Sequence, residues 1–448
     1  MSGSLHDVKN SVWMKTVMIS VGLLFAGIAA YAVLAQGIGT VKHHEWEDAH
    51  HDLEDAEAEW NAANESGTFE EKESADKAWQ DAHHADIDAH LSYLTWSTAG
   101  KTIMVMFIVY AAFYGVAGFF NSIQPDDEDD DHHHGDDHEE HHGSASPILM
   151  AGGILLFMMG FPGFVVTCKS WLGLDYDPDM SGFMLSAIGM IITIMGIGNW
   201  WNEDLKGFPE QIATSKPFEG QDIRKAGMWI FLISETMVFA SFFSSYLRMR
   251  TGWCTQWAVD EKLCGYADDG TYLGPDTFTA SDYLRPGGAV GTGDFWTLLP
   301  GGINTFALII SSYTIVLALK VAKDVNWEPS KNALMARLFP TRQKAVRNYL
   351  LITVALGSLF IVLKLIEWSH LIAEGFTIDS QAGSIFYVAT GAHGLHVFIG
   401  LLVMLFMVFK ADTVGYDEEN GQGIEYFGLY WHFVDLAWVA IFPAFYLY

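Results

Sequence analysis

The stretch Ile385–Phe409 reads IFYVATGAHGLHVFIGLLVMLFMVF and contains no Asp, Glu, Lys or Arg. The hydrocarbon core of a bilayer is about 30 Å thick, and roughly 20 apolar residues in a helix cross it. The length and composition of this stretch therefore predict a membrane-spanning helix. It also carries two ionisable side chains, His393 and His396, which are costly inside a membrane and are therefore candidates for function.

Eight other apolar runs of similar length occur in the 448-residue chain. They lie near Thr16–Ala35, Thr102–Phe120, Pro147–Thr167, Met180–Trp200, Ala226–Leu247, Ile303–Ala322, Tyr349–His370 and Tyr426–Leu447. Together with Ile385–Phe409 they leave little room for a soluble domain. We therefore expect an all-α polytopic membrane protein with nine spans.

The net charge of −30 comes from 24 Lys and Arg against 54 Asp and Glu, and it is concentrated in two segments. His43–His90 carries −14 and Pro125–Gly143 carries −10, and together they hold 13 of the 18 histidines. The chain has no basic stripe that could neutralise phosphates, so nucleic-acid binding is excluded. Its three cysteines are too few for a disulfide scaffold.

The first acidic segment, His43–His90, is predicted to form two polar helices joined by a turn at Asn64–Thr68. Trp46, Leu53 and Trp60 recur every seven residues and form a thin apolar seam. The segment is either a solvated hairpin that caps the outer face, or a docking module or metal collector. The histidines available to collect metal are His43, His44, His50, His51, His83, His84 and His90.

The second acidic segment, Pro125–Gly143, is predicted to be a disordered linker because it contains ten acidic residues and no basic one. Its alternatives are weak metal buffering and docking to a basic partner. We divide the chain into an N-terminal extension over 1–121, whose hairpin covers 43–91, the linker 122–145 and a helical domain over 146–448.

Basic residues predict the orientation in the membrane. The loops 201–225 and 320–348 carry four and seven Lys and Arg, whereas the longer loop 248–302 carries four. We expect the N-terminus and the 125–143 segment inside the cell, and the hairpin and the C-terminus outside. The first span with Ala30-Tyr31-Ala32 is interpreted as an uncleaved anchor rather than a signal peptide, because its apolar run is too long for an h-region.

Among the ionisable residues within predicted spans, Glu235 has no basic neighbour within one helical turn. It either handles protons or lipid headgroups, or forms a simple hydrogen bond to another helix. Two further pairs are spaced i,i+3, so that their members can meet on one helix face. They are Lys364 with Glu367, and His432 with Asp435.

His393 and His396 are also spaced i,i+3, but a buried metal site needs three or four ligands. On the predicted topology Cys168, Cys254 and Cys264 all lie outside the membrane, so we expect structural hydrogen bonding and no metal or redox centre in this chain. A disulfide between Cys254 and Cys264 stays open.

From about Ser146 to Tyr448 the chain resembles subunit III of the haem–copper oxidases, and in particular the cytochrome c oxidase type. The matching stretches are Trp200-Trp201, Gly227–Glu235 (GMWIFLISE), Asn304-Thr305, Glu367, Phe376–Ile378, Phe386–Gly400 (FYVATGAHGLHVFIG) and Tyr430–Asp435 (YWHFVD).

The resemblance implies a seven-helix core in which the first two and the last five helices flank a V-shaped cleft that holds phospholipids. It implies no catalytic centre in this chain, with haem and copper held by partner subunits. The partners would be oxidase subunit I and subunit II, and the complex would lie in the plasma membrane of a prokaryote. Subunit III would keep proton uptake efficient, protect subunit I from inactivation and give oxygen a path through the lipid cleft.

By the same resemblance Glu235 is the cleft carboxylate, and it would contact lipid together with Trp200, Trp201 and Lys206. The residues expected on the signature helices are Glu367, His393, His396, His432 and Asp435. Asn202 departs from the family pattern, which often has Arg there. The N-terminal extension lies outside that pattern and is open to a cytochrome c or another subunit as its partner.

The sequence thus favours a cofactor-free subunit III of a cytochrome c oxidase that works in aerobic electron transport and proton translocation. One alternative is the same subunit in a quinol oxidase or a nitric oxide reductase. Another, from a different class, is a stand-alone membrane protein that binds or transports metal through its His-rich segments.

Overall fold

The computed structural model describes residues 5–122, 144–171, 177–206, 212–250, 295–378, 381–418 and 420–447. Regular structure in these ranges is helical, apart from an isolated bridge between Ile212 and Asp222. Nine of the described helices are long and apolar enough to cross a membrane. The predicted all-α polytopic fold with nine spans is therefore confirmed. The predicted linker and the Cys254–Cys264 disulfide fall outside the described residues, and the division into three domains stays a prediction.

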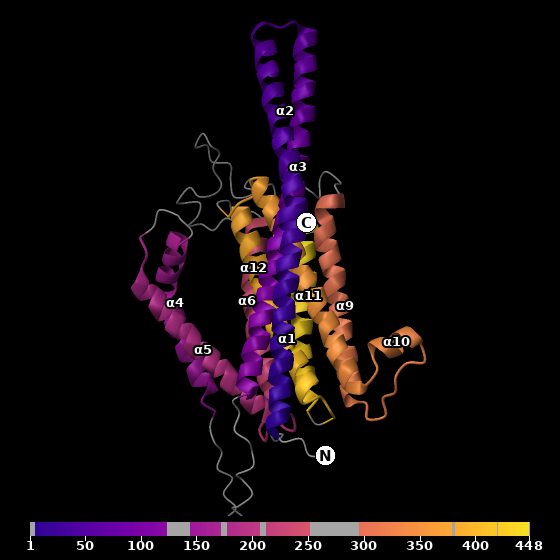
Figure 1. The fold of residues 1–448 in the computed structure, drawn as a ribbon. Coiled ribbons are helices and arrows are strands. Elements are labelled where there is room, and N and C mark those ends of the chain that lie inside the picture. The colour runs from indigo at the N-terminus through magenta and orange to yellow at the C-terminus, as the bar shows by residue number, and fades with distance from the viewer. Residues whose placement is uncertain are drawn as a thin grey trace, which may run out of the picture. The chain divides into compact units, whose positions relative to one another are not determined.

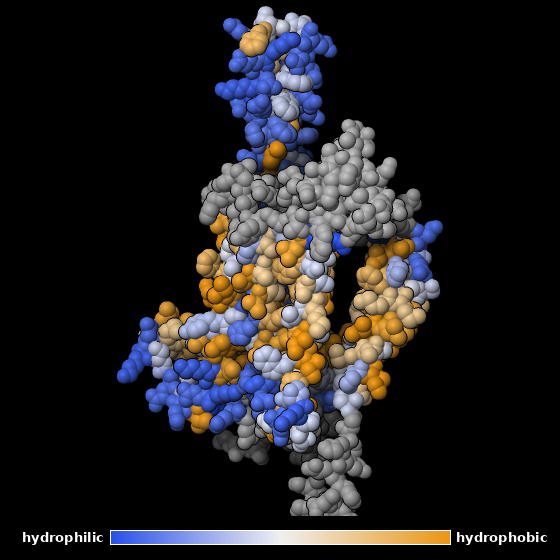
Figure 2. Space-filling view, turned by 180° about the vertical axis from the view of Figure 1, so that it is seen from behind, coloured by the Kyte–Doolittle hydropathy of each residue, from blue (hydrophilic) through white to orange (hydrophobic). Residues whose placement is uncertain are grey.

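The N-terminal helices run from an apolar first half into the polar hairpin. Helix α1 (Leu5–Tyr31) continues through the π-helical stretch η1 (Ala32–Ile38) into α2 (Gly39–Ser66), and the chain returns through α3 (Phe69–Ser122). Figure 1 shows the hairpin formed by α2 and the beginning of α3. On the face shown in Figure 2, hydrophilic residues cover this hairpin, whereas hydrophobic residues dominate the surfaces of the membrane helices. The two-helix hairpin expected from its composition is therefore present.

The turn of the hairpin falls within the predicted break and is closed by a capping box. The Thr68 backbone N–H donates to Glu71 Oε2 over 2.7 Å, and the Glu71 N–H donates back to Thr68 Oγ1 over 3.4 Å. Two N–H groups at the start of α3 are thereby satisfied, which is why this helix begins at Phe69.

Aromatic and histidine side chains form the seam between α2 and α3. The Trp46 ring stacks on His90 with the ring centres 4.3 Å apart, and the Trp60 ring lies 6.1 Å from that of Trp79. The heptad tryptophans of α2 therefore face α3, as the seven-residue spacing predicts.

Helices α4 (Ser146–Trp171) and α5 (Met180–Lys206) pack closely on each other. Together with Met1–Val21 and the end of α3 from Ala111, they belong to one of two compact units of the chain. Glycines permit the close packing, because a Cβ atom at Gly189 would lie 2.3 Å from the Phe157 backbone nitrogen. Small residues that let helix backbones approach are the usual interface of membrane helices.

The other unit contains Gly22–Tyr110 and the five remaining membrane helices. These are α6 (Ile223–Arg250), α9 (Phe295–Lys323), α11 (Arg342–Ala373), α12 (Gln381–Thr413) and α13 (Gln422–Phe442), with the short α10 (Ala333–Leu338) before α11 and the π-helical stretch η6 (Pro443–Leu447) at the end. Helix α11 packs between α9 and α12, and α13 contacts α6, α9 and α12.

Tryptophans fill the core of these five helices. Trp431 and Trp438 of α13 are both fully buried. The Trp431 indole N–H donates to Ser311 of α9 over 2.8 Å, and that of Trp438 donates to Thr305 over 3.0 Å. A buried indole thus satisfies its N–H on a hydroxyl of another helix, which fixes the register of α13 against α9.

Candidate functional site

Glu235, which has no basic neighbour on its own helix, meets a histidine of another helix. Glu235 Oε2 on α6 lies 3.0 Å from Nε2 of His396 on α12. The other ring nitrogen of His396, Nδ1, lies 2.7 Å from the Ala392 carbonyl oxygen one turn earlier. The partner that the sequence left open is therefore one of the signature histidines.

The contacts of His396 indicate which of its ring nitrogens carries a hydrogen. The Ala392 carbonyl can only accept, so Nδ1 carries a hydrogen. Nε2 then either donates a second hydrogen to an ionised Glu235, or accepts the hydrogen of a neutral Glu235 carboxyl group. In either case one hydrogen lies between Nε2 and Oε2.

Aromatic residues surround the Glu235–His396 pair without sealing it. The Tyr430 hydroxyl donates to the His396 carbonyl oxygen over 2.8 Å, and the Phe239 ring centre lies 5.2 Å from that of the imidazole. The side chains of Glu235 and His396 stay 20% and 16% exposed. The pair is therefore accessible from the surface of the helices.

A second charged pair, Lys364 and Glu367 of α11, is buried. Their side chains meet over 2.8 Å, as the i,i+3 spacing predicts. The Tyr446 hydroxyl accepts from Lys364 and donates to Glu367 Oε1. The Lys364 Nζ atom also lies 4.9 Å from the ring centre of Phe386 and 5.3 Å from that of Trp438. Ion pairing, hydrogen bonding and cation–π contacts together offset the cost of burying this lysine.

His432 and Asp435 of α13 interact through a third residue, Ser312 of α9. Ser312 Oγ lies 2.8 Å from His432 Nδ1 and donates its single hydrogen to Asp435 Oδ2. The N–H group at His432 Nδ1 must then donate to Ser312 Oγ. The i,i+3 spacing therefore brings both side chains to one hydroxyl on a neighbouring helix.

The two histidines of the opening stretch have different partners. The His393 ring is fully buried between Phe360 and Trp438, and its Nε2 lies 3.0 Å from the Val434 carbonyl oxygen. Within the described ranges, no group of three or more metal-binding side chains includes His393 or His396. The absence of a redox metal from this chain stays a prediction.

The predicted lipid-contacting residues lie at the end of α5. Trp200 is 48% exposed, whereas Trp201 is 8% exposed and its ring centre lies 4.7 Å from that of Phe113 on α3. Lys206 is the last residue of α5, and its side chain lies outside the described residues. Lipid binding here stays a prediction, and Trp200 is the tryptophan of this pair that offers surface for it.

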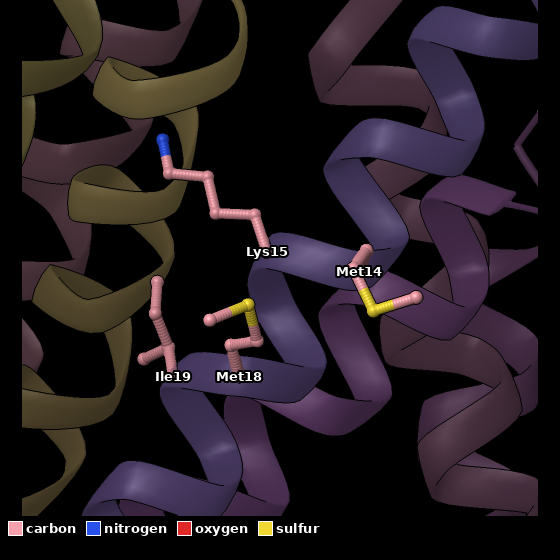
Figure 3. Close-up of a pocket in the computed structure, with 4 residues that line it drawn as sticks. All are labelled: Met14, Lys15, Met18 and Ile19. Atoms are coloured by element: carbon pink, nitrogen blue, oxygen red, sulfur yellow. The ribbon is translucent and has the colours of Figure 1, made fainter.

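A surface hollow on α1 is apolar. Its lining consists of Met14, Lys15, Met18 and Ile19, which extend from successive turns of the helix (Figure 3). Lys15 is exposed at the beginning of the apolar run, where a lysine can extend toward an interface. The hollow fits a lipid-facing helix surface better than a polar binding site.

Sequence reasoning missed the partners that come from other helices. Ser312 and Tyr446 complete two of the clusters described above, and Thr95 Oγ1 of α3 lies 2.8 Å from His370 Nε2 of α11. Ser, Thr and Tyr are common in membrane helices and carry no local pattern that marks them. Only the packing of the helices reveals these contacts.

The helices and their paired polar residues define a polytopic α-helical membrane protein with polar clusters between helices. Its residues 292–448 match the family described as cytochrome c oxidase subunit III. The probable quinol oxidase subunit 3 of Staphylococcus epidermidis is 30% identical over 235 residues, which are 52% of this chain and 92% of that protein. Proteins of the same name from Staphylococcus haemolyticus and Staphylococcus aureus are 28% identical over 236 and 235 residues, again 92% of each protein.

The chain therefore belongs to the subunit III family of the haem–copper oxidases. It is a membrane subunit of an oxidase complex, which implies association with other oxidase subunits.

Proposed function

We propose that this chain supports proton uptake and prolongs the active life of the haem-bearing subunit I of its oxidase through the Glu235–His396 pair. The observation that carries the proposal is the partly exposed contact of 3.0 Å between these side chains within membrane helices. Loss of the proton shared by this pair leaves one negative charge, and the partial exposure of both side chains lets water or a polar group of lipid offset that charge while a proton is taken up again.

Phospholipids are the proposed ligands of this chain. Glu235, Trp200, Trp201 and Lys206 are the residues proposed to contact them, because an ionisable carboxylate and interfacial aromatic rings suit headgroups. Haem and copper belong to the partner subunits I and II. In this proposal the lipid headgroups keep the surface near Glu235 polar enough for proton exchange. The apolar part of the lipid gives oxygen a route.

The proposed location is the plasma membrane of a prokaryote, with the N-terminus inside and the C-terminus outside. The basic loops 201–225 and 320–348 support this orientation.

We propose cytochrome c as the electron donor of the complex, because Glu235 stands where the quinol type tends to have Asp. The second candidate donor is a quinol, and the names of the staphylococcal relatives favour it. Purification of the complex in mild detergent distinguishes the two donors. Under the proposal, the purified complex consumes oxygen when it is supplied with ferrocytochrome c. A complex that oxidises only quinol contradicts the proposal. If no haem protein co-purifies with the chain, the proposed function in an oxidase is contradicted.

Glu235→Ala tests the role of the pair. We expect the complex to assemble with a normal haem spectrum, but to lose activity severalfold faster during turnover or to retain less phospholipid. Glu235→Gln keeps a hydrogen bond to His396 but cannot ionise, and it should decay at an intermediate rate.

The matched control is Glu328→Ala, which removes an exposed carboxylate from the loop before α10. It should leave both measurements unchanged. Activity decay and lipid content of Glu235→Ala that equal those of the parent would overturn the proposal.

A further inference from the structure

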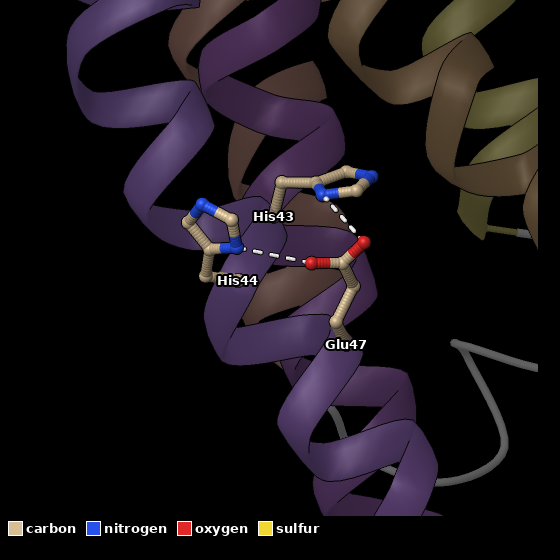
Figure 4. A group of neighbouring side chains, drawn as sticks. All are labelled: His43, His44 and Glu47. Atoms are coloured by element: carbon tan, nitrogen blue, oxygen red, sulfur yellow. Dashed lines mark hydrogen bonds and ion pairs between the residues drawn. The ribbon is translucent and has the colours of Figure 1, made fainter.

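Two imidazoles and a carboxylate come together near the beginning of α2. Glu47 Oε2 lies 3.0 Å from His44 Nδ1, and Glu47 Oε1 lies 3.5 Å from His43 Nδ1. One ligand atom from each of the three residues lies within 4.8 Å of the other two. Each oxygen of the Glu47 carboxylate faces one of the two rings (Figure 4). We infer that His43, His44 and Glu47 bind a divalent transition-metal ion of the zinc class.

The distances require only a small adjustment on binding. Zinc binds histidine nitrogen and carboxylate oxygen at about 2.0–2.1 Å, so the ligands of a tetrahedral site lie about 3.3 Å apart. The two contacts, one to each oxygen of Glu47, are 3.0 and 3.5 Å long and so lie close to this separation. The side chains of His44 and Glu47 are 71% and 55% exposed and can rotate to bring the imidazoles closer. Water would complete the coordination.

The donor set selects the metal. Imidazole nitrogen suits zinc, copper and nickel, whereas calcium and magnesium prefer sites made only of oxygen. The surrounding segment His43–His90 carries sixteen acidic residues against two lysines, which raises the local concentration of cations. The site therefore combines general attraction for cations with a local preference for borderline transition metals.

One of the ligands is held in place by its surroundings. The His43 ring centre lies 5.5 Å from that of Trp46 and 4.9 Å from that of Tyr93, which comes from α3. Side chains packed against a ligand orient it for the metal. His43 is therefore the preorganised ligand, and the exposed His44 and Glu47 would close around the ion.

The next pair of histidines on α2 provides an internal control. His51 lies 3.8 Å from Asp55 with the same i,i+4 spacing, in the same acidic helix. His51 and Asp55 are both exposed. Within the described part of the chain, only the His43 cluster brings three ligands together. A general affinity of the acidic surface for metal would involve both positions, whereas a defined site involves only the first.

The test is zinc titration of the full-length chain after removal of metal by a chelator. In the parent and in all variants, alanine replaces the six histidines of the acidic linker: His132, His133, His134, His138, His141 and His142. We expect one zinc ion per chain in calorimetry. His43→Ala, His44→Ala and Glu47→Gln should each weaken zinc binding about tenfold or more, since loss of even an outer-shell partner costs about that much.

The control variant His51→Ala with Asp55→Asn should bind zinc as the parent does. Calcium chloride in excess should not displace the zinc. When Cu²⁺ is bound in place of zinc, its paramagnetic resonance spectrum should show fewer nitrogen ligands after His43 or His44 is replaced. Circular dichroism verifies that the variants keep their helices. Unchanged zinc affinity in the three ligand variants, an equal loss in the control, or displacement by calcium would each overturn the inference.

Discussion

Three ionisable side chains within the described membrane helices, Glu235, Lys364 and Glu367, are paired across helices or within one turn. Glu235 meets His396, and Lys364 meets Glu367 and Tyr446. An unpaired charge has no water to solvate it in the bilayer, so each such residue needs a partner in the protein. The chemistry of a single residue therefore predicts that a partner exists, although it does not identify that partner.

Lys364→Met tests the buried pair. The variant leaves Glu367 buried without its ammonium partner, and we expect it to lower the free energy of unfolding by about 3–5 kcal/mol. The double variant Lys364→Met with Glu367→Met removes both charges and should recover much of this loss. Reversible unfolding in mixed detergent micelles measures both values.

The control for this prediction is Lys320→Met, which replaces an exposed lysine near the end of α9. It should change stability little. A Lys364→Met variant as stable as this control would show that the pair does not stabilise the fold.

At the scale of elements, the packing of α4 on α5 depends on glycine. A Cβ atom at Gly160 would lie 2.4 Å from the Gly182 carbonyl oxygen, and one at Gly189 would lie 2.3 Å from the Phe157 nitrogen. Backbone atoms cannot rotate away as a side chain can. The two helices would have to separate to accept a methyl group, and they would lose van der Waals contacts along the interface.

Gly189→Ala should therefore destabilise the helix pair by about 1–3 kcal/mol, the usual cost of overpacking. Gly152→Ala, on α4, is the matched control because a Cβ atom there has no neighbour within 4 Å. Thermal denaturation of the purified complex should show a lower midpoint for Gly189→Ala than for Gly152→Ala. Equal midpoints would contradict close packing of these two helices.

The beginning of α5 depends on a carboxylate that lies outside the membrane spans. Asp179 Oδ1 accepts hydrogen bonds from the Ser181 hydroxyl over 2.7 Å and from the Gly182 N–H over 3.1 Å. These donors hold the pKa of the Asp179 carboxyl below its usual range. Since the folded-state pKa is lowered, this stabilisation is present above the unfolded pKa of about 3.9 and is lost as the pH falls through the lowered value.

We therefore expect the first turn of α5 to open more often as the pH falls below about 4. Hydrogen exchange of its amides, corrected for the intrinsic rate at each pH, measures this opening. Asp179→Asn keeps a capping oxygen but does not titrate, and its opening should not vary with pH in this range. The same pH dependence in the Asn variant would assign the effect to another group.

At the scale of the whole molecule, the orientation can be tested by labelling with a maleimide that does not cross membranes. In a background in which Cys168, Cys254 and Cys264 are serine, Asn64→Cys at the hairpin tip should react in intact cells. Asn326→Cys, in the basic loop after α9, should react only after the membrane is permeabilised. The opposite pattern would reverse the predicted topology.

The spans could be predicted because each depends on local composition. A run such as Ile385–Phe409 has the length and apolarity of a bilayer crossing wherever it packs. The hairpin turn near Thr68 was predictable for the same reason, since polar turn residues interrupt two helical segments. The π-helical stretch Ala32–Ile38 was not predicted, because its alanines and leucine suit an ordinary helix equally well.

The sequence by itself determined the class of this protein, its helices and the ionisable residues that need a polar partner within the membrane. The tertiary structure decided which residues meet. His396 contacts Glu235, which lies 161 positions earlier in the sequence, whereas His393, three residues before His396, contacts the Val434 carbonyl oxygen. Residues on one helix differ in direction by about 100° per position, so only the packing of neighbouring helices decides which partner each one finds.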